Sequence, residues 1–248
     1  MQNTLITGAT GGLGQALVRA YAPQSELLLV HGRDTAQLNK LCLEFKKEFP
    51  HCKFIPLSAD FCRLDSAKDL VEQLQNININ CEKLILNVGY SESRSFAEIS
   101  PEASRDLLFA NLNSQIELAS RLLPQLEKII VISSSGAYQP GPYTALYYAA
   151  KSALSSWAAA ICEEGDLEVL LVCPGALKTN FALKAGRQIA PLALSPTRVA
   201  ADILRADLRA RKYLAPGLFN KLAISLTKLM PASINAKIVG KIQKTQTK

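Results

Sequence analysis

Short apolar runs alternate with stretches of helical periodicity along most of this chain, and that alternation limits the folds open to it. Six runs rich in strand-forming residues lie at 5–7, 27–31, 54–57, 84–87, 129–133 and 169–173. Helical patterns lie between and after them, at 13–22, 35–49, 64–75, 101–123, 143–164 and 196–210. Strands joined through helices run parallel and are covered by helices on both faces. The pattern predicts an α/β fold with a Rossmann-like, doubly wound parallel β-sheet.

No linker or composition break divides residues 1–217, so we expect a single domain there. The chain has 248 residues, 48% hydrophobic and 20% charged, which is typical of a folded soluble protein. Residues 218–248 differ, because apolar residues recur at helical spacing on a lysine-rich background that is interrupted at Pro231. We interpret this segment as a basic amphipathic C-terminal extension.

The positive charge of the protein is concentrated in that extension. It holds six lysines and no acidic residue, against a net charge of +7 for the chain. The domain itself is nearly neutral, so a nucleic-acid partner is not expected. Two hypotheses remain for the extension: peripheral contact with an anionic membrane surface, or packing on the domain or a neighbouring subunit, which we favour slightly. The apolar side would consist of Leu222, Ile224, Leu226, Leu229, Ile238 and Ile242.

Cysteine and histidine usage gives no sign of a metal site or a disulfide framework. The six cysteines include no C-x-x-C pair, and only two histidines accompany them. No signal-peptide pattern follows the first methionine. We therefore expect a cytoplasmic protein, with the extension as a peripheral contact at the inner membrane face under the membrane hypothesis.

The first strand run leads directly into a glycine-rich segment, TGATGGLG at residues 7–14. Glycines allow a sharp turn and a close approach to a pyrophosphate at the N-terminus of the next helix, where amide groups and the helix dipole favour an anion. The second run ends at Gly32-Arg33, where an NAD-binding sheet would carry an acidic residue. Arg33 is suited to a 2′-phosphate instead, so NADP(H) is favoured over NAD(H), although Asp34 is adjacent.

Tyr147 and Lys151 stand four residues apart in the helix after the fifth strand, and so share a helix face. A nearby ammonium lowers the pKa of a phenol, which predicts a proton-transferring tyrosine. Tyr143 and Tyr148 have no lysine at that spacing. Serines at 133–135 end the fifth strand, at the sheet edge where such folds bind ligands, and one hydroxyl there would hydrogen-bond a substrate carbonyl.

Taken in order, these motifs resemble those of the short-chain dehydrogenase/reductase family, in its short single-domain branch, over about residues 3–217. The family's glycine motif falls on Thr7, Gly8, Gly12 and Gly14, its adenine-pocket acid on Asp60, its N-A-G turn on Asn87-Val88-Gly89, and its P-G-x-x-x-T motif on Pro174, Gly175 and Thr179. The resemblance implies a cofactor site made of Gly8, Thr10, Gly12, Leu13, Gly14, Arg33, Asp60, Phe61, Asn87, Gly89, Tyr147, Lys151, Pro174, Gly175 and Thr179.

The same resemblance implies four catalytic residues and no metal. Tyr147 would be the general acid that protonates a carbonyl oxygen, and Lys151 would lower its pKa and hold the nicotinamide ribose. Ser134, 13 residues before the tyrosine, would orient the carbonyl, and Asn111 would support a proton-relay water. Thr179 would contact the carboxamide end of the cofactor. The expected activity is NADP(H)-dependent interconversion of a carbonyl and an alcohol.

Two alternatives stay open. A protein of this fold that binds NADP without catalysis would be a sensor or scaffold. The glycines at 8, 11 and 14 also match the longer branch of the family, which includes sugar-nucleotide epimerases and dehydratases, but chain length and Pro174-Gly175 argue against that branch. Val88 and Leu86 depart from the family's usual alanine and asparagine, which would shift the turn after the fourth strand slightly.

The segment Phe181–Leu194 is the expected substrate loop. Its apolar residues together with Lys184 and Arg187 favour a lipophilic substrate that carries an acidic group. The resemblance also makes a homodimer or homotetramer the expected assembly, through symmetric packing of the helices at 101–123 and 143–164.

Overall fold

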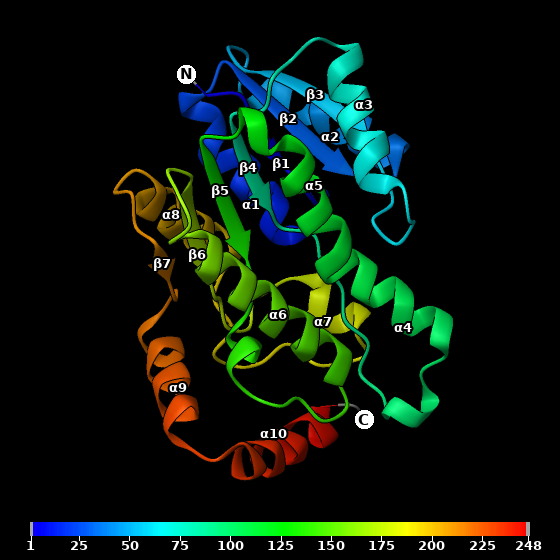
Figure 1. Cartoon of the computed structure of the whole chain (residues 1–248), viewed down its shortest axis with the longest axis vertical. Coiled ribbons are helices and arrows are strands. Elements are labelled where there is room, and N and C mark those ends of the chain that lie inside the picture. The colour runs from blue at the N-terminus through cyan, green and yellow to red at the C-terminus, as the bar shows by residue number, and fades with distance from the viewer. Residues whose placement is uncertain (1, 247–248) are drawn as a thin grey trace.

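A computed structural model describes residues 2–246, and Met1, Thr247 and Lys248 lie outside the described residues. All pairings in its seven-stranded sheet are parallel, in the order β3-β2-β1-β4-β5-β6-β7 (Figure 1). The strands are β1 (Thr4–Ile6), β2 (Leu27–Gly32), β3 (Lys53–Ser58), β4 (Lys83–Leu86), β5 (Lys128–Ile132), β6 (Glu168–Val172) and β7 (Tyr213–Leu214). The prediction of a Rossmann-like, doubly wound sheet is confirmed. Strand β7 was not predicted, because two residues are too short to show periodicity.

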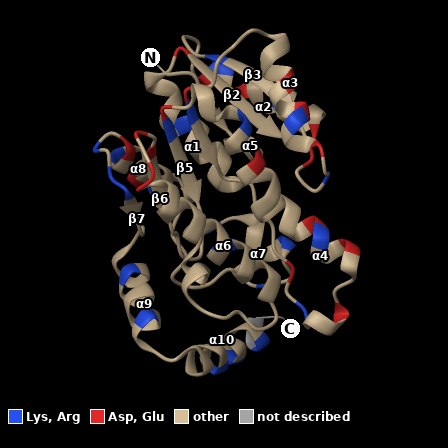
Figure 2. Cartoon of the chain, in the orientation of Figure 1, with Lys and Arg blue, Asp and Glu red and all other residues tan. Residues whose placement is uncertain are grey.

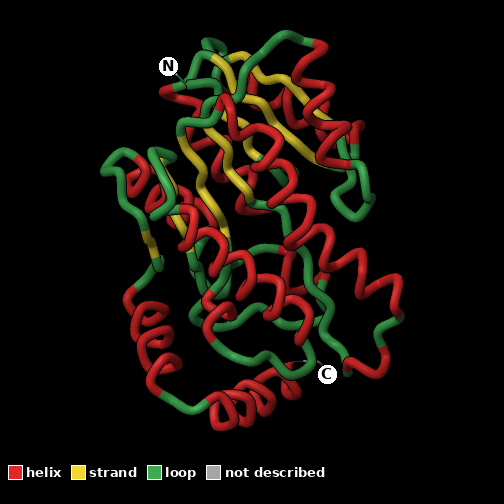
Figure 3. The backbone as a smooth tube through the Cα atoms, in the orientation of Figure 1, coloured by secondary structure: helices red, strands yellow, loops and turns green. Residues whose placement is uncertain are grey.

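Helices connect the strands and cover both faces of the sheet (Figures 1 and 3). Helices α1, α2 and α8 share one core cluster with the sheet, whereas α3, α5 and α6 share the other. Successive strand residues alternate between the clusters, as Leu5 and Ile6 do in β1. The helices of the body are α1 (Gly12–Tyr21), α2 (Thr35–Glu48), α3 (Ser66–Asn76), α4 (Pro101–Leu108), α5 (Ser114–Leu122), α6 (Ala145–Ile161), α7 (Asn180–Lys184) and α8 (Pro196–Asp207).

The order of the strands places a ligand crevice at the centre of the sheet. From β1 the chain proceeds outward to β2 and β3, then returns to β4 on the other side of β1. Loops that leave the carboxyl ends of β1 and β4 therefore diverge, and open α/β sheets bind ligands at such a point. The glycine-rich segment follows β1, and Asn87 follows β4.

The helix predicted over 101–123 is interrupted where the chain passes this crevice. Residues Phe109–Asn113 form a π-helical turn between α4 and α5. The side-chain amide of Asn111 donates hydrogen bonds to the carbonyls of Leu107 and Tyr90, at 2.9 Å each. The bond to Leu107 competes with the regular helix ladder, which explains why the helix widens into a π-helical turn here instead of keeping α-helical geometry throughout.

The C-terminal extension forms two further helices, α9 (Leu218–Leu229) and α10 (Ala232–Gln246), with the break at Pro231 that the sequence indicates. Figure 1 shows them curving around the end of the molecule where α6 begins. Ile224 of α9 packs into the core, and the Asn220 amide donates to the carbonyl of Cys173 at 2.8 Å. None of the helices within residues 2–246 is both long enough and apolar enough to cross a bilayer.

Candidate active site

The glycine-rich turn is the closest-packed part of the site. Gly8 has φ +64°, a conformation that side chains disfavour. A Cβ on Gly14 would lie 2.1 Å from the carbonyl oxygen of Gly8, so the first turn of α1 rests directly on the turn after β1. A Cβ on Gly12 would lie 2.6 Å from Cγ2 of Thr179, which places Thr179 across the glycine turn. At the N-terminus of α1, a ligand would therefore meet the backbone of glycine residues.

Two side chains brace this turn. Asn87 donates through Nδ2 to the carbonyls of Thr7 and Gly8, at 2.9 and 3.2 Å. His31, near the end of β2, accepts from the amide of Gly8 at Nδ1 (3.3 Å), so Nε2 carries the proton and donates to Ala59 (3.0 Å). Burial lowers the pKa of His31 to about 4, so the ring stays neutral at physiological pH. Sequence reasoning assigned no role to His31, and its position before Gly32-Arg33 was the only available signal.

Arg33 and its neighbour Asp34 occupy different environments. Arg33 is exposed in the loop after β2. The carboxylate of Asp34 accepts the amide of Gln37 at 2.9 Å as the N-cap of α2, so that carboxylate is committed to the helix. At the next strand end, Asp60 is half-buried and accepts the amide of Cys62 at 3.2 Å.

Some residues of the predicted cofactor site lie in the core instead of lining a surface. Phe61 is buried and stacks on His31 with ring centroids 4.5 Å apart. Leu13 is a core residue on the inner side of α1. Thr10, which is partly exposed, packs against Gly32, where a Cβ would lie 2.9 Å from its methyl group. We conclude that Phe61 and Leu13 support the site through packing.

The four predicted catalytic residues converge at the ends of β4 and β5. Ser134 Oγ accepts the amide of Gly136 at 3.1 Å and hydrogen-bonds Tyr147. Lys151 Nζ lies 6.0 Å from the centroid of the Tyr147 ring and donates to the carbonyl of Ile132 at 3.0 Å. A Cβ on Gly89 would lie 2.9 Å from Asn111 Oδ1 and 3.5 Å from Lys151 Nζ, so both groups crowd this glycine.

Burial dominates the titration of the two central groups. It raises the pKa of Tyr147 to about 12, although the hydrogen bond from Ser134 and the charge of Arg187 act to lower it. Burial also lowers the pKa of Lys151 to about 8. The sequence predicted that Lys151 would lower the pKa of Tyr147. In this structure desolvation of the phenol dominates, and the groups that act to lower its pKa are Ser134 and Arg187. The raised pKa makes the phenolate form of Tyr147 less accessible than in a free tyrosine.

The other serines of the strand-end run have structural partners. Ser133 Oγ donates to the carbonyl of Lys151 at 3.0 Å and lies 2.6 Å from Ser155 Oγ, which fixes α6 against β5. Ser135 begins a short 3₁₀ turn. Ser134 is therefore the serine of the run whose hydroxyl contacts Tyr147.

On the opposite side of the crevice, the loop after β6 carries the predicted P-G-x-x-x-T motif, at Pro174, Gly175 and Thr179. The carbonyl of Pro174 accepts the amide of Ser135 at 2.8 Å, which joins this loop to the serine segment. A Cβ on Gly175 would lie 3.0 Å from Asn220 Oδ1 of α9. The extension thus contacts the rim of the site, an interaction that sequence reasoning missed because nothing in the motif pattern points to Asn220.

The expected substrate loop faces Tyr147 and is tied to the extension. The Phe181 and Tyr147 rings lie 5.6 Å apart between centroids. Arg187 Nη1 donates to Gln243 Oε1 of α10 at 3.1 Å, and Gln243 Nε2 donates to the Tyr148 hydroxyl at 3.1 Å. Arg187 Nε is buried and has no hydrogen-bond partner among the described residues. Within residues 2–246, no group of three or more His, Cys, Asp or Glu side chains is arranged to hold a metal ion.

Comparison with known families fits this arrangement. A family model described as short chain dehydrogenase matches residues 2–190. The chain belongs to the short-chain dehydrogenase/reductase family. The match begins ahead of the glycine turn and continues through the predicted catalytic residues into the expected substrate loop.

Curated relatives match over nearly the whole chain. Dehydrogenase/reductase SDR family member 7B of Xenopus laevis is 28% identical, covering 92% of this chain and 77% of the relative. A ketoacyl reductase of Nostoc is 27% identical, covering 98% of this chain and 86% of the relative. The family is thus one of oxidoreductases, as its members' names state.

Solved structures share the fold at lower identity. A short-chain dehydrogenase from Sphingobium yanoikuyae in complex with NADPH superposes with a TM-score of 0.81 at 22% identity, covering 93% of this chain and 95% of that chain. A family member from Burkholderia phymatum in complex with NAD superposes with a TM-score of 0.80 at 18% identity, covering 91% and 92%. These likenesses establish the fold.

The packing of the glycine turn generates a stability prediction. We expect Gly14→Ala to lower the free energy of unfolding by about 1–3 kcal/mol, because its Cβ has to displace backbone. Gly165→Ala is the matched control, since its Cβ would meet nothing within 4 Å. Urea unfolding of both variants provides the measurement. Equal unfolding midpoints for the two variants would contradict the close packing described above.

Proposed function

We propose that this protein is an NADP(H)-dependent oxidoreductase that interconverts a carbonyl and an alcohol. The observation that carries the proposal is the cluster at the crevice, where the Tyr147 hydroxyl meets Ser134 and the Lys151 ammonium lies beneath the phenol ring. This cluster adjoins the N-terminus of α1, where a ligand would meet the backbone of glycine residues. A proton donor beside an anion-binding turn suits reduction of a carbonyl with a dinucleotide.

The residues present fit a nicotinamide dinucleotide. Glycines at 8, 12 and 14 let the turn after β1, the first turn of α1 and Thr179 pack closely together. This packing presents the N-terminus of α1 at the crevice, where a pyrophosphate would bind. Asn111 Oδ1 is buried without a hydrogen-bond partner among the described residues. We infer that this oxygen accepts a water or ligand hydroxyl. When bound, the cofactor supplies or accepts hydride at its nicotinamide ring.

The chain's own residues position the carbonyl and move the proton. The hydroxyls of Ser134 and Tyr147 donate hydrogen bonds to the substrate oxygen. Tyr147 then transfers its proton to that oxygen as the alcohol forms. Its phenol carries that proton at neutral pH, and burial raises its pKa further. Lys151 Nζ donates to the carbonyl of Ile132 and keeps further N–H groups that would bind the nicotinamide ribose.

The environment of Arg33 supports a preference for NADP(H). Its guanidinium is exposed at the end of β2, while the adjacent Asp34 carboxylate caps α2. A ribose 2′-hydroxyl would therefore find no uncommitted carboxylate at this strand end, whereas a 2′-phosphate would form charge-assisted bonds with Arg33.

The substrate loop supports a lipophilic substrate with an acidic group. Phe181 lies against the Tyr147 ring and supplies apolar surface. Arg187 acts electrostatically on Tyr147, and its Nε is buried with no hydrogen-bond partner in the part of the chain that the structure describes. Among the described residues no carboxylate forms an ion pair with Arg187. A substrate carboxylate or phosphate would satisfy that guanidinium.

The cofactor assignment predicts an effect of Arg33→Ala. We expect the affinity for NADPH to fall about tenfold or more, with NADH affinity nearly unchanged, because only NADPH carries the 2′-phosphate. Fluorescence titration with each nucleotide provides the measurement. Arg209→Ala, which changes another exposed arginine, is the control. An equal loss of affinity for NADPH and NADH in Arg33→Ala would refute the assignment.

The role of Tyr147 predicts that Tyr147→Phe lowers kcat by about 10²–10⁴-fold and leaves NADPH affinity intact, because the variant loses the proton donor and keeps the ring. Tyr143→Phe is the control and should retain most activity. The readout is steady-state reduction of a panel of lipophilic ketones. An active Tyr147→Phe enzyme would rule out the general-acid role, and tight NADPH binding without turnover in the wild type would favour a sensor or scaffold.

The role of Arg187 predicts a change in substrate preference. Arg187→Met should lower kcat/KM for a ketone bearing a carboxylate about tenfold or more relative to a neutral ketone of equal size. Lys184→Met, which removes an exposed cation from the same loop, should leave that ratio unchanged. If Arg187→Met affects both ketones equally, the guanidinium does not recognise an acidic group.

A further inference from the structure

Helices α9 and α10 carry a row of large apolar side chains that face away from the protein. Eight of the eighteen exposed large apolar residues in the described chain belong to these two helices, and each is 45% to 83% exposed. Those eight are Leu218, Phe219, Leu222, Leu226, Leu229, Ile234, Ile238 and Ile242. In α10 the isoleucines recur every four residues, so they form one continuous stripe.

The inward face of α10 is largely polar, the reverse of an ordinary surface helix. Its buried side chains are Asn235, Val239 and Gln243. Asn235 donates to the carbonyl of Thr227 at 2.9 Å, and Gln243 joins Arg187 to Tyr148. Hydrogen bonds therefore hold this helix on the protein, while its apolar stripe is left for another contact.

The charges around the stripe are all positive. The extension has six lysines and no acidic residue, and the described ones, at 221, 228, 237, 241 and 244, are exposed. Figure 2 shows only basic residues on α9 and α10, whereas α2, α3, α4, α5 and α8 carry both signs. Lys237 and Lys241 directly precede Ile238 and Ile242 along α10. An apolar stripe bordered by lysines suits an anionic lipid surface.

We propose that the outward faces of α9 and α10 dock on an anionic bilayer, with the helices parallel to the membrane plane. The apolar side chains enter the boundary between headgroups and acyl chains, and the lysines bind the lipid phosphates. The break at Pro231 lets the two helices contact the same surface at different angles. The docking itself does not depend on the catalytic assignment.

Charge argues against a second copy of this chain as the occupant. A two-fold symmetric contact brings the same surface of two copies together, so lysines from both would gather with no acidic residue of the extension to offset them. An anionic bilayer supplies the missing negative charge.

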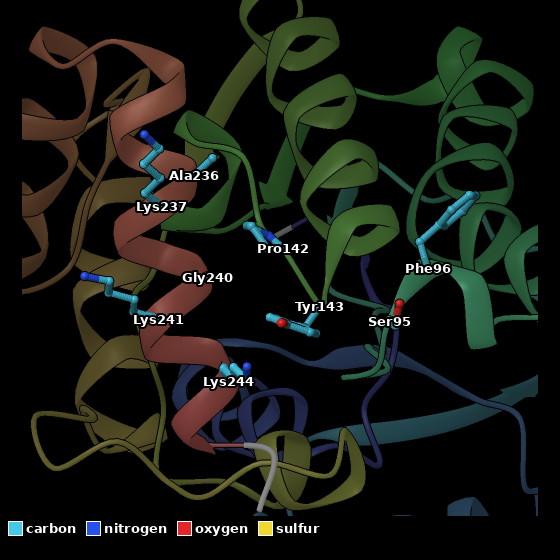
Figure 4. Close-up of a pocket in the computed structure, with 9 residues that line it drawn as sticks. All are labelled: Ser95, Phe96, Pro142, Tyr143, Ala236, Lys237, Gly240, Lys241 and Lys244. Atoms are coloured by element: carbon cyan, nitrogen blue, oxygen red, sulfur yellow. The ribbon is translucent and has the colours of Figure 1, made fainter.

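Docking in this way would place the membrane beside the substrate side of the site. Helix α10, the loop before α6 and the Ser95-Phe96 segment line an open pocket of about 400 Å³. Figure 4 shows Pro142 and Tyr143 beside the α10 segment that carries Gly240 and Lys244. Gln243 links the same helix to Arg187 of the substrate loop. If the proposed function is taken as given, this geometry implies that a lipophilic substrate enters the site from the bilayer. That implication rests on the proposed function.

Vesicle flotation of the full chain tests the docking. We expect the protein to float with phosphatidylcholine vesicles that contain phosphatidylserine, to float poorly without phosphatidylserine, and to bind less as ionic strength rises. A variant with Ile234→Gln, Ile238→Gln and Ile242→Gln should have an affinity for the anionic vesicles that is lower by about tenfold or more, because the apolar stripe is gone. Lys237→Gln with Lys241→Gln should also reduce binding about tenfold or more.

The control carries Leu43→Gln and Leu64→Gln, two side chains that are each 67% exposed elsewhere on the protein, and should bind vesicles like the wild type. Circular dichroism establishes that every variant is folded, and the lysine pair provides a second route if the isoleucine variant is not. Wild-type protein that stays unbound to anionic vesicles would overturn the proposal. Sedimentation showing that the isoleucine variant breaks a dimer, without vesicle binding by the wild type, would assign the face to a second copy.

Discussion

The site depends on one close contact, the first turn of α1 resting on the turn after β1. A side chain at Gly14 would overlap the carbonyl oxygen of Gly8, so the helix can approach this closely only through glycine. The approach directs the N-terminus of α1 at the crevice between β1 and β4. Asn87 from β4 and His31 from β2 then hydrogen-bond the same turn, which fixes its geometry relative to the neighbouring strands.

Burial is the second organising effect, and it acts on Tyr147 and Lys151, the two groups proposed to carry the chemistry. Tyr147 and Lys151 are both shifted toward their neutral forms, since desolvation penalises a charged phenolate and a charged ammonium alike. Fixed hydrogen bonds from Ser134 and to the carbonyl of Ile132 hold the two side chains in place. The π-helical turn at Asn111 leaves a buried amide oxygen with no hydrogen-bond partner among residues 2–246, a cost that a bound water or ligand would offset.

The sequence predicts the sheet and the clustering of motifs because these follow from local patterns. Apolar runs identify six strands, and glycines and the tyrosine-lysine spacing identify the loops at their ends. Features that arise from tertiary packing were missed: the two-residue strand β7, the π-helical turn and the brace at His31. In the extension, helical spacing grouped Ile224 with the other apolar residues. The structure buries Ile224 in the core and turns the rest outward, because polar contacts at Asn235 and Gln243 hold α10.

The central claim is hydride transfer between a nicotinamide and a carbonyl carbon beside Tyr147. It is tested most directly by incubating the protein with lipophilic ketones and NADPH deuterated at the transferring position of the nicotinamide ring, followed by mass spectrometry of the products. The account predicts alcohols that carry deuterium on the former carbonyl carbon. Tight binding of the nucleotide without deuterated alcohol from any ketone would contradict it, and would leave a nucleotide-binding protein without redox chemistry.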